Sequence, residues 1–270
     1  MKPEITPRQK SIMEFICQHG SVQVDTLSKY LNVTPQTIRR DLSRLFDLKL
    51  ITRVHGGAMI RHDIENLGYS ARQMLMVEEK TEIAQLAAQL IQDHSSLFIN
   101  IGTTTEKVAN YLTNRTGMMV ITNNINVAAI LFPVSGVEVM IAGGTVRKSD
   151  GGIVGPNTQE FIERFKVDHA VIGCSSIDSD GEIFDFDMQE VRVTQSIIKR
   201  ARSIIMVADS MKFDRKAPVK VCDLSDIDIL VTDRHLSSEM AQLCEQMEVK
   251  VEVATAKDVD RHMGESCNVN

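Results

Sequence analysis

The sequence predicts an α/β protein of two domains, a small helical one at the N-terminus and a larger one built on a parallel sheet. Two observations predict this division. Apolar residues in 1–60 recur at helical spacing and are followed by a short alternating stretch and His55-Gly56-Gly57, which favours a β-hairpin. From residue 96 onward, short apolar runs alternate with amphipathic segments, and that alternation indicates a largely parallel sheet covered by helices.

The composition is that of a globular protein without a membrane segment. Of 270 residues, 43% are hydrophobic and 24% are charged, and no apolar run approaches the ~20 residues that span a bilayer. The N-terminus lacks the apolar core of a signal peptide. Five scattered cysteines form no C-x-x-C pair, so neither a disulfide framework nor a zinc site is predicted. We therefore expect a reduced, cytoplasmic protein that needs no metal and no cofactor.

Charge is divided unevenly between the two predicted domains. Residues 1–60 contain nine basic and five acidic side chains, a net charge of +4, so the other 210 residues carry −10 of the total of −6. A basic first domain on an acidic body is expected where only the first domain meets phosphate.

Each element of the first domain follows from a local signal. A capping threonine and a proline at the first helical position open two predicted helices, 7–19 and 35–47. A β-prone stretch at Ser21–Val24 and a short helix ending at Asn32 lie between them. After residue 49 the apolar period falls to about two, which predicts a β-hairpin with a glycine tip, a wing. The first domain is therefore predicted to be a winged helix-turn-helix.

The predicted helix 35–47 suits the major groove of DNA, because the groove admits one helix and residues near its N-terminus reach base edges. Gln36 can pair with adenine, and Arg39 or Arg40 with guanine or phosphate. A solvated basic face would be the alternative, but capped turn, wing and charge together favour DNA binding. The predicted DNA-contacting residues are Thr34, Pro35, Gln36, Thr37, Arg39, Arg40, Arg44, Arg53 and His55. Asp41 is expected to pair with Arg44 or with a base of the first helix instead.

The larger domain is predicted to contain six strands and at least six helices, in the order of a βα-repeating chain. The strands are expected at 96–101, 118–122, 138–142, 169–173, 203–208 and 227–232. The helices are expected at 77–92, 105–112, 127–132, 156–164, 188–200 and 237–246.

Polar, glycine-bearing turns follow three of these strands in succession. In open α/β sheets, ligands bind at the carboxyl ends of strands, where helix N-termini present their amide groups. A Gly-Thr-Thr turn that opens a helix offers N–H groups and hydroxyls to a phosphate, and arginine or lysine adds counter-charge. The predicted phosphate-site residues are Gly102, Thr103, Thr104, Asn123, Asn124, Gly143, Gly144, Arg147 and Lys212.

The run T-P-Q-T-I-R-R-D-L followed by the H-G-G wing resembles the DNA-binding domain of the DeoR family of bacterial repressors. The second domain resembles the effector domain of that family, which is related in fold to ribose-5-phosphate isomerase and glucosamine-6-phosphate deaminase. The resemblance implies a transcriptional repressor that a phosphorylated metabolite releases from double-stranded operator DNA. It assigns an effector role to the turn residues above and adds Glu190. Asn100 departs from the family, which usually has aspartate there.

The stretches F-I-N-I-G-T-T, T-N-N-I-N-V-A, D-G-G-I-V-G, I-D-S-D-G-E-I-F-D-F-D and M-K-F-D-R carry the resemblance further. They imply glycerol 3-phosphate as the effector and a glycerol catabolic regulon as the target, although Ser176 stands where glycine is usual. Fructose 1-phosphate, a deoxyribonucleoside phosphate and a sugar-acid phosphate remain open alternatives. One small DNA-reading domain rarely gives enough specificity alone, so a homodimer or homotetramer is expected.

An isomerase or deaminase is the competing class, with Asp185, Asp187, Glu190 and Lys212 as acid–base candidates. Clustered acids of this kind are more often a solvated loop, so no catalytic residue is predicted. The expected division is a DNA-binding domain at 1–60, a linker at 61–76, an effector-binding and oligomerisation domain at 77–256, and a disordered tail at 257–270.

Overall fold

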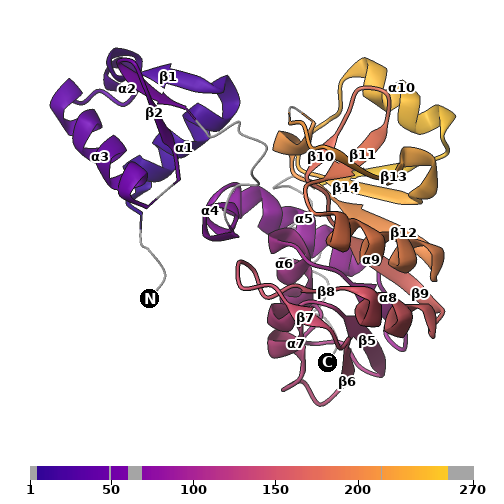
Figure 1. Cartoon of the computed structure of the whole chain (residues 1–270). Coiled ribbons are helices and arrows are strands. Elements are labelled where there is room, and N and C mark those ends of the chain that lie inside the picture. Colours follow the sequence, from indigo (N-terminus) through magenta and orange to yellow (C-terminus); the bar gives the residue numbers. More distant parts are fainter. Residues whose placement is uncertain (1–4, 49, 60–68, 214, 255–270) are drawn as a thin grey trace, which may run out of the picture. The chain divides into compact units, whose positions relative to one another are not determined.

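The computed structural model describes residues 5–48, 50–59, 69–213 and 215–254, which fall into two compact units (Figure 1). The N-terminal unit extends to Val77 and the C-terminal unit begins at Glu78. Among the helices described, none is long and apolar enough to cross a membrane. Each unit has its own buried core, so each is described by itself.

The N-terminal unit contains three helices, a three-stranded sheet and a further short helix. Its elements are α1 (Pro7–His19), β1 (Ser21–Gln23), α2 (Val24–Tyr30), α3 (Pro35–Asp47), β2 (Thr52–Val54), β3 (Gly57–Met59) and α4 (Tyr69–Met74). The sheet has the order β1-β3-β2, with both pairs antiparallel. The predicted winged helix-turn-helix is confirmed, and β1 adds a third strand to the wing.

Helix α4 lies inside the segment that was expected to be a linker. Its residues Met74 and the following Leu75 pack against the core of the N-terminal unit, and Leu75 is only 3% exposed. The rest of the predicted linker, residues 61–68, lies outside the described residues, as does the predicted tail at 257–270. Burial of Leu75 makes the end of the linker segment part of the N-terminal unit.

The C-terminal unit is built on a seven-stranded sheet in which every neighbouring pair is parallel, with the order β15-β14-β12-β9-β4-β5-β6. Its strands are β4 (Ser96–Ile99), β5 (Met118–Thr122), β6 (Val137–Ile141), β9 (Val167–Ile172), β12 (Ala201–Val207), β14 (Ile229–Thr232) and β15 (Lys250–Val253). The six predicted strands are all present. The seventh, β15, was not predicted.

Helices cover both faces of this sheet. On one face, α5 (Val77–Gln89), α6 (Thr103–Tyr111) and α7 (Ile125–Leu131) bury Ile83, Val108 and Val127 completely. On the other face lie α8 (Pro156–Glu163), α9 (Met188–Lys199) and α10 (Ser238–Gln246). A parallel sheet is stable in water only with both faces covered, which explains its near-continuous apolar strands.

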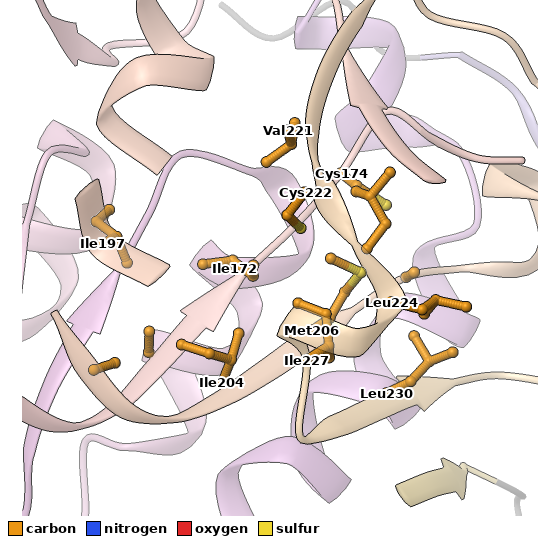
Figure 2. Packing of buried hydrophobic residues seen from close by; sticks show 14 of the residues in the cluster. Ile172, Cys174, Ile197, Ile204, Met206, Val221, Cys222, Leu224, Ile227 and Leu230 are labelled. Atoms are coloured by element: carbon orange, nitrogen blue, oxygen red, sulfur yellow. The ribbon is translucent and has the colours of Figure 1, made fainter. Parts of the chain in front are cut away.

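Two small antiparallel sheets complete the C-terminal unit, and the sequence analysis missed both. Strands β10 (Ser176–Ile177), β11 (Glu182–Asp185) and β13 (Val219–Asp223) form one, and β7 (Thr145–Val146) with β8 (Ile153–Val154) forms the other. Figure 2 shows how Val221 and Cys222 of β13 pack with Ile172 of β9 and Met206 of β12. The first small sheet therefore extends the core under α9.

The strand order reverses direction between β4 and β9. From β4, the first strand of this unit, the chain builds outward to β5 and β6, and then returns to the other side of β4 with β9. The carboxyl ends of β4 and β9 border this switch point, where α/β folds of this type bind their ligands. Hydrogen bonds cross it, since the Asn100 N–H donates to Val171 O at 3.2 Å.

Candidate functional site

Helix α3 is fixed at its start by its own sequence. The Thr34 hydroxyl accepts a hydrogen bond from the Thr37 N–H at 3.3 Å, and Pro35 occupies the first helical position. Ile38, Leu42 and Leu45 are buried against the rest of the N-terminal unit. Because these apolar residues occupy one face, the polar residues of α3 face outward.

The outward face of α3 carries the predicted DNA-contacting residues. Pro35, Gln36, Arg39, Arg40 and Arg44 are exposed, whereas Thr37 is half-buried and Thr34 serves as the helix cap. Within the described part of the chain, none of the three α3 guanidinium groups makes an ion pair. A basic helix face whose charges are not neutralised by the protein is suited to binding phosphates and base edges.

Asp41 lies on the inner side of α3. Its carboxylate accepts hydrogen bonds from Arg8 Nε at 2.5 Å and from Gln9 Nε2 at 3.0 Å, both on α1. Of the two partners that the sequence left open, the first-helix base is therefore the correct one, and Arg44 is not. The hydrogen bond and the charge of Asp41 raise the pKa of Arg8. Asp41 thus joins α1 to α3 and is buried, away from the outward face of α3.

The wing is attached to the end of α3. The Arg53 guanidinium on β2 lies 4.7 Å from the centre of the Phe46 ring, a cation–π contact. His55 is exposed at the turn, and its carbonyl oxygen accepts a hydrogen bond from Gln23 Nε2 at 3.3 Å. Gly56 has φ +75°, which a side chain would disfavour. These contacts position the wing relative to α3.

In the C-terminal unit, helix α6 opens directly after β4 and begins at Thr103, two residues earlier than predicted. Among the residues that the structure describes, no side chain caps its first turn. The Thr105 hydroxyl instead donates to the carbonyls of Asn100 and Gly102 at 2.9 and 2.8 Å, which holds the turn closed. The first amide groups of α6 therefore point toward the switch point with the positive end of the helix dipole.

Asn123 and Asn124 follow β5, next to β4 in the sheet. The Asn124 amide donates to Glu106 on α6 at 3.1 Å, and its oxygen accepts from the Asn126 N–H at the start of α7. The Asn123 amide donates to Ile153 O at 3.1 Å. Its Oδ1, however, is buried and has no hydrogen-bond partner in the described structure. An unsatisfied buried acceptor of this kind is costly unless a ligand or water donates to it.

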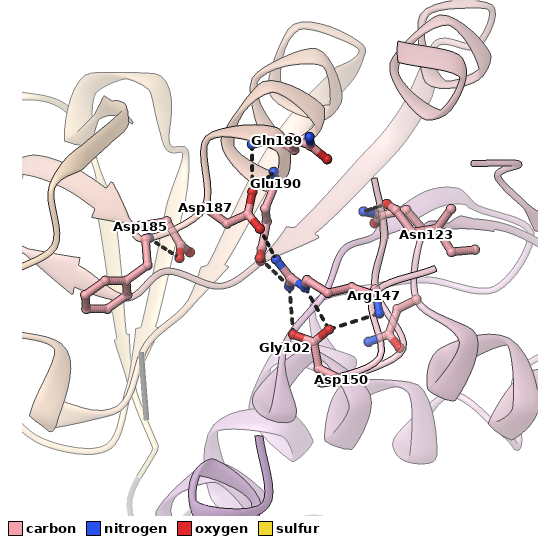
Figure 3. A network of polar contacts seen from close by, with 12 residues as sticks. Gly102, Asn123, Arg147, Asp150, Asp185, Asp187, Gln189 and Glu190 are labelled. Atoms are coloured by element: carbon pink, nitrogen blue, oxygen red, sulfur yellow. Dashed lines mark hydrogen bonds and ion pairs between the residues drawn. The ribbon is translucent and has the colours of Figure 1, made fainter. Parts of the chain in front are cut away.

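Arg147 is bound by three carboxylates, as Figure 3 shows. Its guanidinium donates to both oxygens of Asp150 at 2.9 and 2.7 Å, to Asp187 at 2.9 Å and to Glu190 at 2.6 Å. We call Arg147, Asp150, Asp187 and Glu190 the Arg147 cluster. Burial opposes the charge of Arg147, but the bonds and charges of Asp150 and Glu190 outweigh it and raise the pKa of Arg147. The cluster ties the segment after β7 to the start of α9.

The Arg147 cluster bears on two predictions from the sequence. Arg147 was predicted to bind a phosphate, yet in this structure four of its five N–H groups donate to carboxylates, so a phosphate that needs two N–H groups would have to replace a carboxylate. Asp187 was considered a solvated acid or a catalytic base. Its partial burial is outweighed by hydrogen bonds from Arg147 and from two amides at the start of α9, which lower the pKa of Asp187. It therefore serves as an ionised partner and helix cap.

The remaining predicted residues have more local roles. Gly143 O accepts a hydrogen bond from the Thr158 hydroxyl at 2.9 Å. A Cβ at Gly144 would lie 2.1 Å from that same hydroxyl, so only glycine fits there. Asn100 is buried, and its side chain accepts from the Gly173 N–H at 3.2 Å and donates to Thr194 Oγ1 at 3.4 Å. Asn100 therefore joins β4, β9 and α9.

Lys212 lies in the short 3₁₀ helix η1 (Ser210–Lys212) after β12, and its N–H donates to Asp209 O at 2.9 Å. Burial raises the pKa of the Cys174 thiol to about 12, with Lys212 acting to lower it and Asp185 and Asp209 to raise it. The Asp185 carboxylate accepts a hydrogen bond from the hydroxyl of Ser175, the residue after Cys174, at 2.9 Å.

Sequence reasoning missed several residues of this region: Glu106, Asn126, Asp150 and Asp209. The Asn126 amide donates to Glu106 at 3.0 Å and to Asp150 O at 2.9 Å, and so links α6 to the Arg147 cluster. The D-G-G turn at 150–152 was the available signal, since the Asp150 carboxylate accepts from the Gly152 N–H at 3.1 Å. The hydrogen bonds of Glu106 with Asn124 and Asn126, and those of Arg147 with Asp187 and Glu190, join residues 18 to 43 positions apart. Contacts over such distances produce no recognisable local pattern in the sequence.

Comparison with known proteins gives the same two-part division. Residues 8–67 match the DeoR-like helix-turn-helix domain, and residues 75–234 match the DeoR C terminal sensor domain. The chain is 39% identical over 248 residues to the glycerol-3-phosphate regulon repressor of Escherichia coli (strain K12), which covers 92% of this chain and 98% of the relative. It is 42% identical over 225 residues to the glycerol-3-phosphate regulon repressor of Haemophilus influenzae, which covers 83% of this chain and 88% of the relative.

A distant likeness to a solved structure covers about half of this chain. A ribose-5-phosphate isomerase in complex with phospho-erythronic acid matches with a TM-score of 0.39 and 14% identity, over 51% of this chain and 54% of that one. So distant a likeness carries no argument about chemistry.

Proposed function

Because this chain belongs to the DeoR family of transcriptional repressors, we propose that it represses a glycerol catabolic regulon and that glycerol 3-phosphate releases it from the operator. Operator DNA and a small-molecule effector are the partners that a DNA-binding domain joined to a sensor domain implies. Bacterial DNA lies in the cytoplasm, and we place the protein there.

The observation that carries the effector assignment is the pairing of an uncapped helix N-terminus with an unsatisfied acceptor. The first amides of α6 suit an anion, and the buried Asn123 Oδ1 needs a hydrogen-bond donor. Asn124 and Glu106 connect the two features through a 3.1 Å hydrogen bond. A phosphorylated polyol supplies both groups, phosphate oxygens for the amides and hydroxyls for Asn123. Glycerol 3-phosphate is a compound of this kind, and the two relatives compared above are named for it.

The remaining predicted effector residues enter this proposal in supporting roles. Thr103 and Thr104 supply the amides, and Lys212 supplies positive charge. Arg147 and Glu190 contribute by joining the segment after β7 to α9. Gly102, Gly143 and Gly144 contribute backbone groups to the proposed site, and at Gly144 a Cβ would lie 2.1 Å from Thr158 Oγ1.

For DNA, we propose that Gln36 and Arg39 read base edges, whereas Thr34, Thr37, Arg40, Arg44 and Arg53 bind mainly phosphates. The N-terminal half of a recognition helix reaches the bases, and residues farther along meet the backbone. A single small domain reads only one half-site, so we propose a homodimer or homotetramer on repeated half-sites.

Release follows from linkage between the two ligands. If the effector prefers a conformation with weak operator affinity, the two ligands oppose each other by one coupling free energy, typically ~1–3 kcal/mol. The test is a thermal-shift panel of phosphorylated metabolites, followed by operator binding with each compound that shifts. Glycerol 3-phosphate at 100 times its dissociation constant should stabilise the protein by about 2.7 kcal/mol and lower operator affinity. If only fructose 1-phosphate or another panel member does so, the effector assignment is wrong.

A further inference from the structure

Apart from one asparagine, helix α7 consists of apolar residues, and one of its sides is exposed. Val127 and Leu131 are completely buried beneath the helix. Ile125, Ala129 and, at its end, Phe132 recur at the spacing of one helix face, and all three are exposed, Phe132 by 72%. A helix that is apolar all round is normally covered on all sides. The residues that the structure describes therefore leave one apolar side of α7 uncovered.

The apolar surface continues from α7 onto the neighbouring strands. In Figure 1, α7 and β6 lie together at one end of the C-terminal unit, and β6 is the last strand of the seven-stranded sheet there. Ile141 at the end of β6 is 45% exposed, and Val146 on the following strand β7 is 48% exposed. The other edge strand, β15, is protected by the charges of Lys250 and Glu252, which lie 2.7 Å apart. The β6 edge carries one charge, that of Glu138, and therefore needs another form of protection.

The charge distribution indicates what covers this surface. No residue between 116 and 137 is charged, and this is the longest uncharged stretch of the chain. Residues 61–270 carry a net charge of −10, so most surfaces of two copies repel each other when they approach. Exposed apolar patches mark interaction sites, and an uncharged one admits a second copy without this repulsion. The stretch 116–137, which contains α7 and leads into β6, is therefore well suited to self-association.

Two exposed charges border this surface at opposite ends. Glu138 lies at the start of β6, and Lys148 lies in the turn between β7 and β8. Gly151 of that turn accepts the Ile125 N–H at 3.1 Å, which places the turn beside the start of α7 and hence at the carboxyl end of β6. Neither charged side chain forms an ion pair with another residue that the structure describes. A two-fold axis through the middle of β6 would bring Glu138 of each copy toward Lys148 of the other.

We propose that the α7–β6 face joins two copies of this chain across a two-fold axis. The face consists of Ile125, Ala129, Phe132, Ile141 and Val146. The inference rests on the proposed function, since one DNA-reading domain serves one half-site and an operator of two half-sites needs two copies. The β6 strands of the copies run antiparallel, so Phe132 meets the end of the other copy's face that carries Ile141 and Val146. An aromatic anchor with a polar rim is the usual construction of such interfaces, and Glu138 and Lys148 form the rim here.

The first test measures the mass of the full-length protein by light scattering over a range of concentrations. The wild type should have the mass of two or four chains, and Phe132→Glu should halve it, because the interface would bury unpaired carboxylates. Phe132→Leu keeps an apolar anchor and should keep the mass. Tyr30→Glu places the same charge on a 61% exposed aromatic residue of the N-terminal unit and should leave the mass unchanged. Since Phe132 is exposed in one chain, the circular dichroism spectrum of Phe132→Glu should remain that of the folded protein.

The second test exchanges the charges at the rim. Glu138→Lys and Lys148→Glu each place like charges opposite one another and should weaken association about threefold to tenfold at low salt. The double variant Glu138→Lys/Lys148→Glu restores both pairs with their signs exchanged, so it should associate as tightly as the wild type. A local structural effect of either substitution would not be reversed by the other. A double variant that associates no better than the single variants overturns the proposed two-fold arrangement.

An unchanged mass of Phe132→Glu overturns the inference, whether another surface joins the copies or a segment of the same chain covers the face. A wild type that has the mass of one chain at every concentration contradicts both this inference and the proposed oligomer. If the mass is halved as expected but no phosphorylated metabolite shifts the melting temperature, the effector proposal fails and the interface stands.

Discussion

Arg8 Nε donates a 2.5 Å hydrogen bond to Asp41 Oδ2 and so joins the first turn of α1 to the middle of α3. The other carboxylate oxygen of Asp41 accepts from Gln9 Nε2 at 3.0 Å. Asp41 is therefore an acidic residue of a basic helix, and it stabilises the packing of α1 against α3. The outward face of α3 keeps only the basic and neutral side chains proposed to contact DNA. Its contacts set the angle at which α3 is presented.

Replacing Asp41 by alanine should destabilise the N-terminal unit by about 1–3 kcal/mol, because the buried amide of Gln9 loses its acceptor. Arg8→Ala should have a smaller effect, since the Arg8 side chain is 42% exposed and can be solvated. Hydrogen exchange at the amides of α1 and α3 in the full chain measures the loss. Equal effects of the two substitutions would contradict the buried role given to Asp41.

Replacing Arg39 or Gln36 by alanine should relax base specificity at one operator position and weaken operator binding by about 1–3 kcal/mol if the contact is bidentate. Both side chains are exposed at the N-terminal half of α3, and neither forms a hydrogen bond or ion pair with the residues that the structure describes, so their loss should not lower stability. Binding to a panel of single-base operator variants measures the effect. Arg164→Ala, at the exposed residue that follows α8, removes the same charge and should leave operator affinity unchanged. Normal operator binding by the Arg39 variant would count heavily against this assignment.

Replacing Arg53 by alanine should weaken binding to all sequences similarly and reduce the salt slope by about one unit, as expected for a phosphate contact. Phe46→Leu keeps the arginine but removes the ring beneath it. If the ring positions the guanidinium, this variant should lose part of the affinity and keep most of the salt slope. Affinity measured between low and high salt separates the two outcomes. A Phe46→Leu variant with the operator affinity of the wild type would show that the Phe46 ring is not needed to position the Arg53 guanidinium.

The helices and parallel strands could be predicted because their signals are local. Thr34 and Pro35 define the start of α3 through a cap and a fixed φ angle, and the predicted bounds of α3 agree with the structure. The small sheet of β10, β11 and β13 could not be predicted, because its strands are short and pair Ile183 with Cys222, 39 positions away. Edge strand β15 is only four residues long and half-buried, so its apolar pattern is weak.

The candidate site could be predicted only where the local sequence indicates a backbone feature, such as a glycine-containing turn that begins a helix. The Gly102-Thr103-Thr104 turn predicts a helix N-terminus at this point, and the structure has α6 beginning at Thr103 with a buried first turn. The partners of Arg147 could not be deduced, since Asp187 and Glu190 lie 40 and 43 positions away and similar acids are usually solvated.

Replacing Arg147 by alanine should destabilise the C-terminal unit by about 3–5 kcal/mol, because Asp150 and Glu190 are buried and would keep uncompensated charge. Arg147→Lys should recover part of the loss, since lysine restores the charge but not the bidentate bonds to Asp150. Thermal unfolding of the full chain measures both. The hydrogen bonds from Asn126 to Asp150 O and Glu106 should loosen with the cluster, so effector affinity should fall too. A stable Arg147→Ala variant would contradict the structural role of the cluster.

The Arg147–Asp187 contact should weaken in acid. The pKa of Asp187 is lowered in the folded state, because the bonds from Arg147 and the α9 amides outweigh the effect of partial burial. A carboxyl group with a lowered folded-state pKa contributes stability above its unfolded value of about 3.9, and loses that contribution as pH falls through the folded value. Asp187→Asn keeps the helix cap but removes the charge, so wild type and variant should differ at neutral pH and converge below about pH 4. The difference should stay under about 1 kcal/mol, since the Asp187 side chain is 37% exposed.

Melting temperatures of both proteins between pH 3 and 7 measure this difference. The lowered pKa of Asp168, held by Ser96, affects both proteins equally and cancels in the comparison. A difference that stays constant with pH would show that Asp187 acts on α9 as a cap alone.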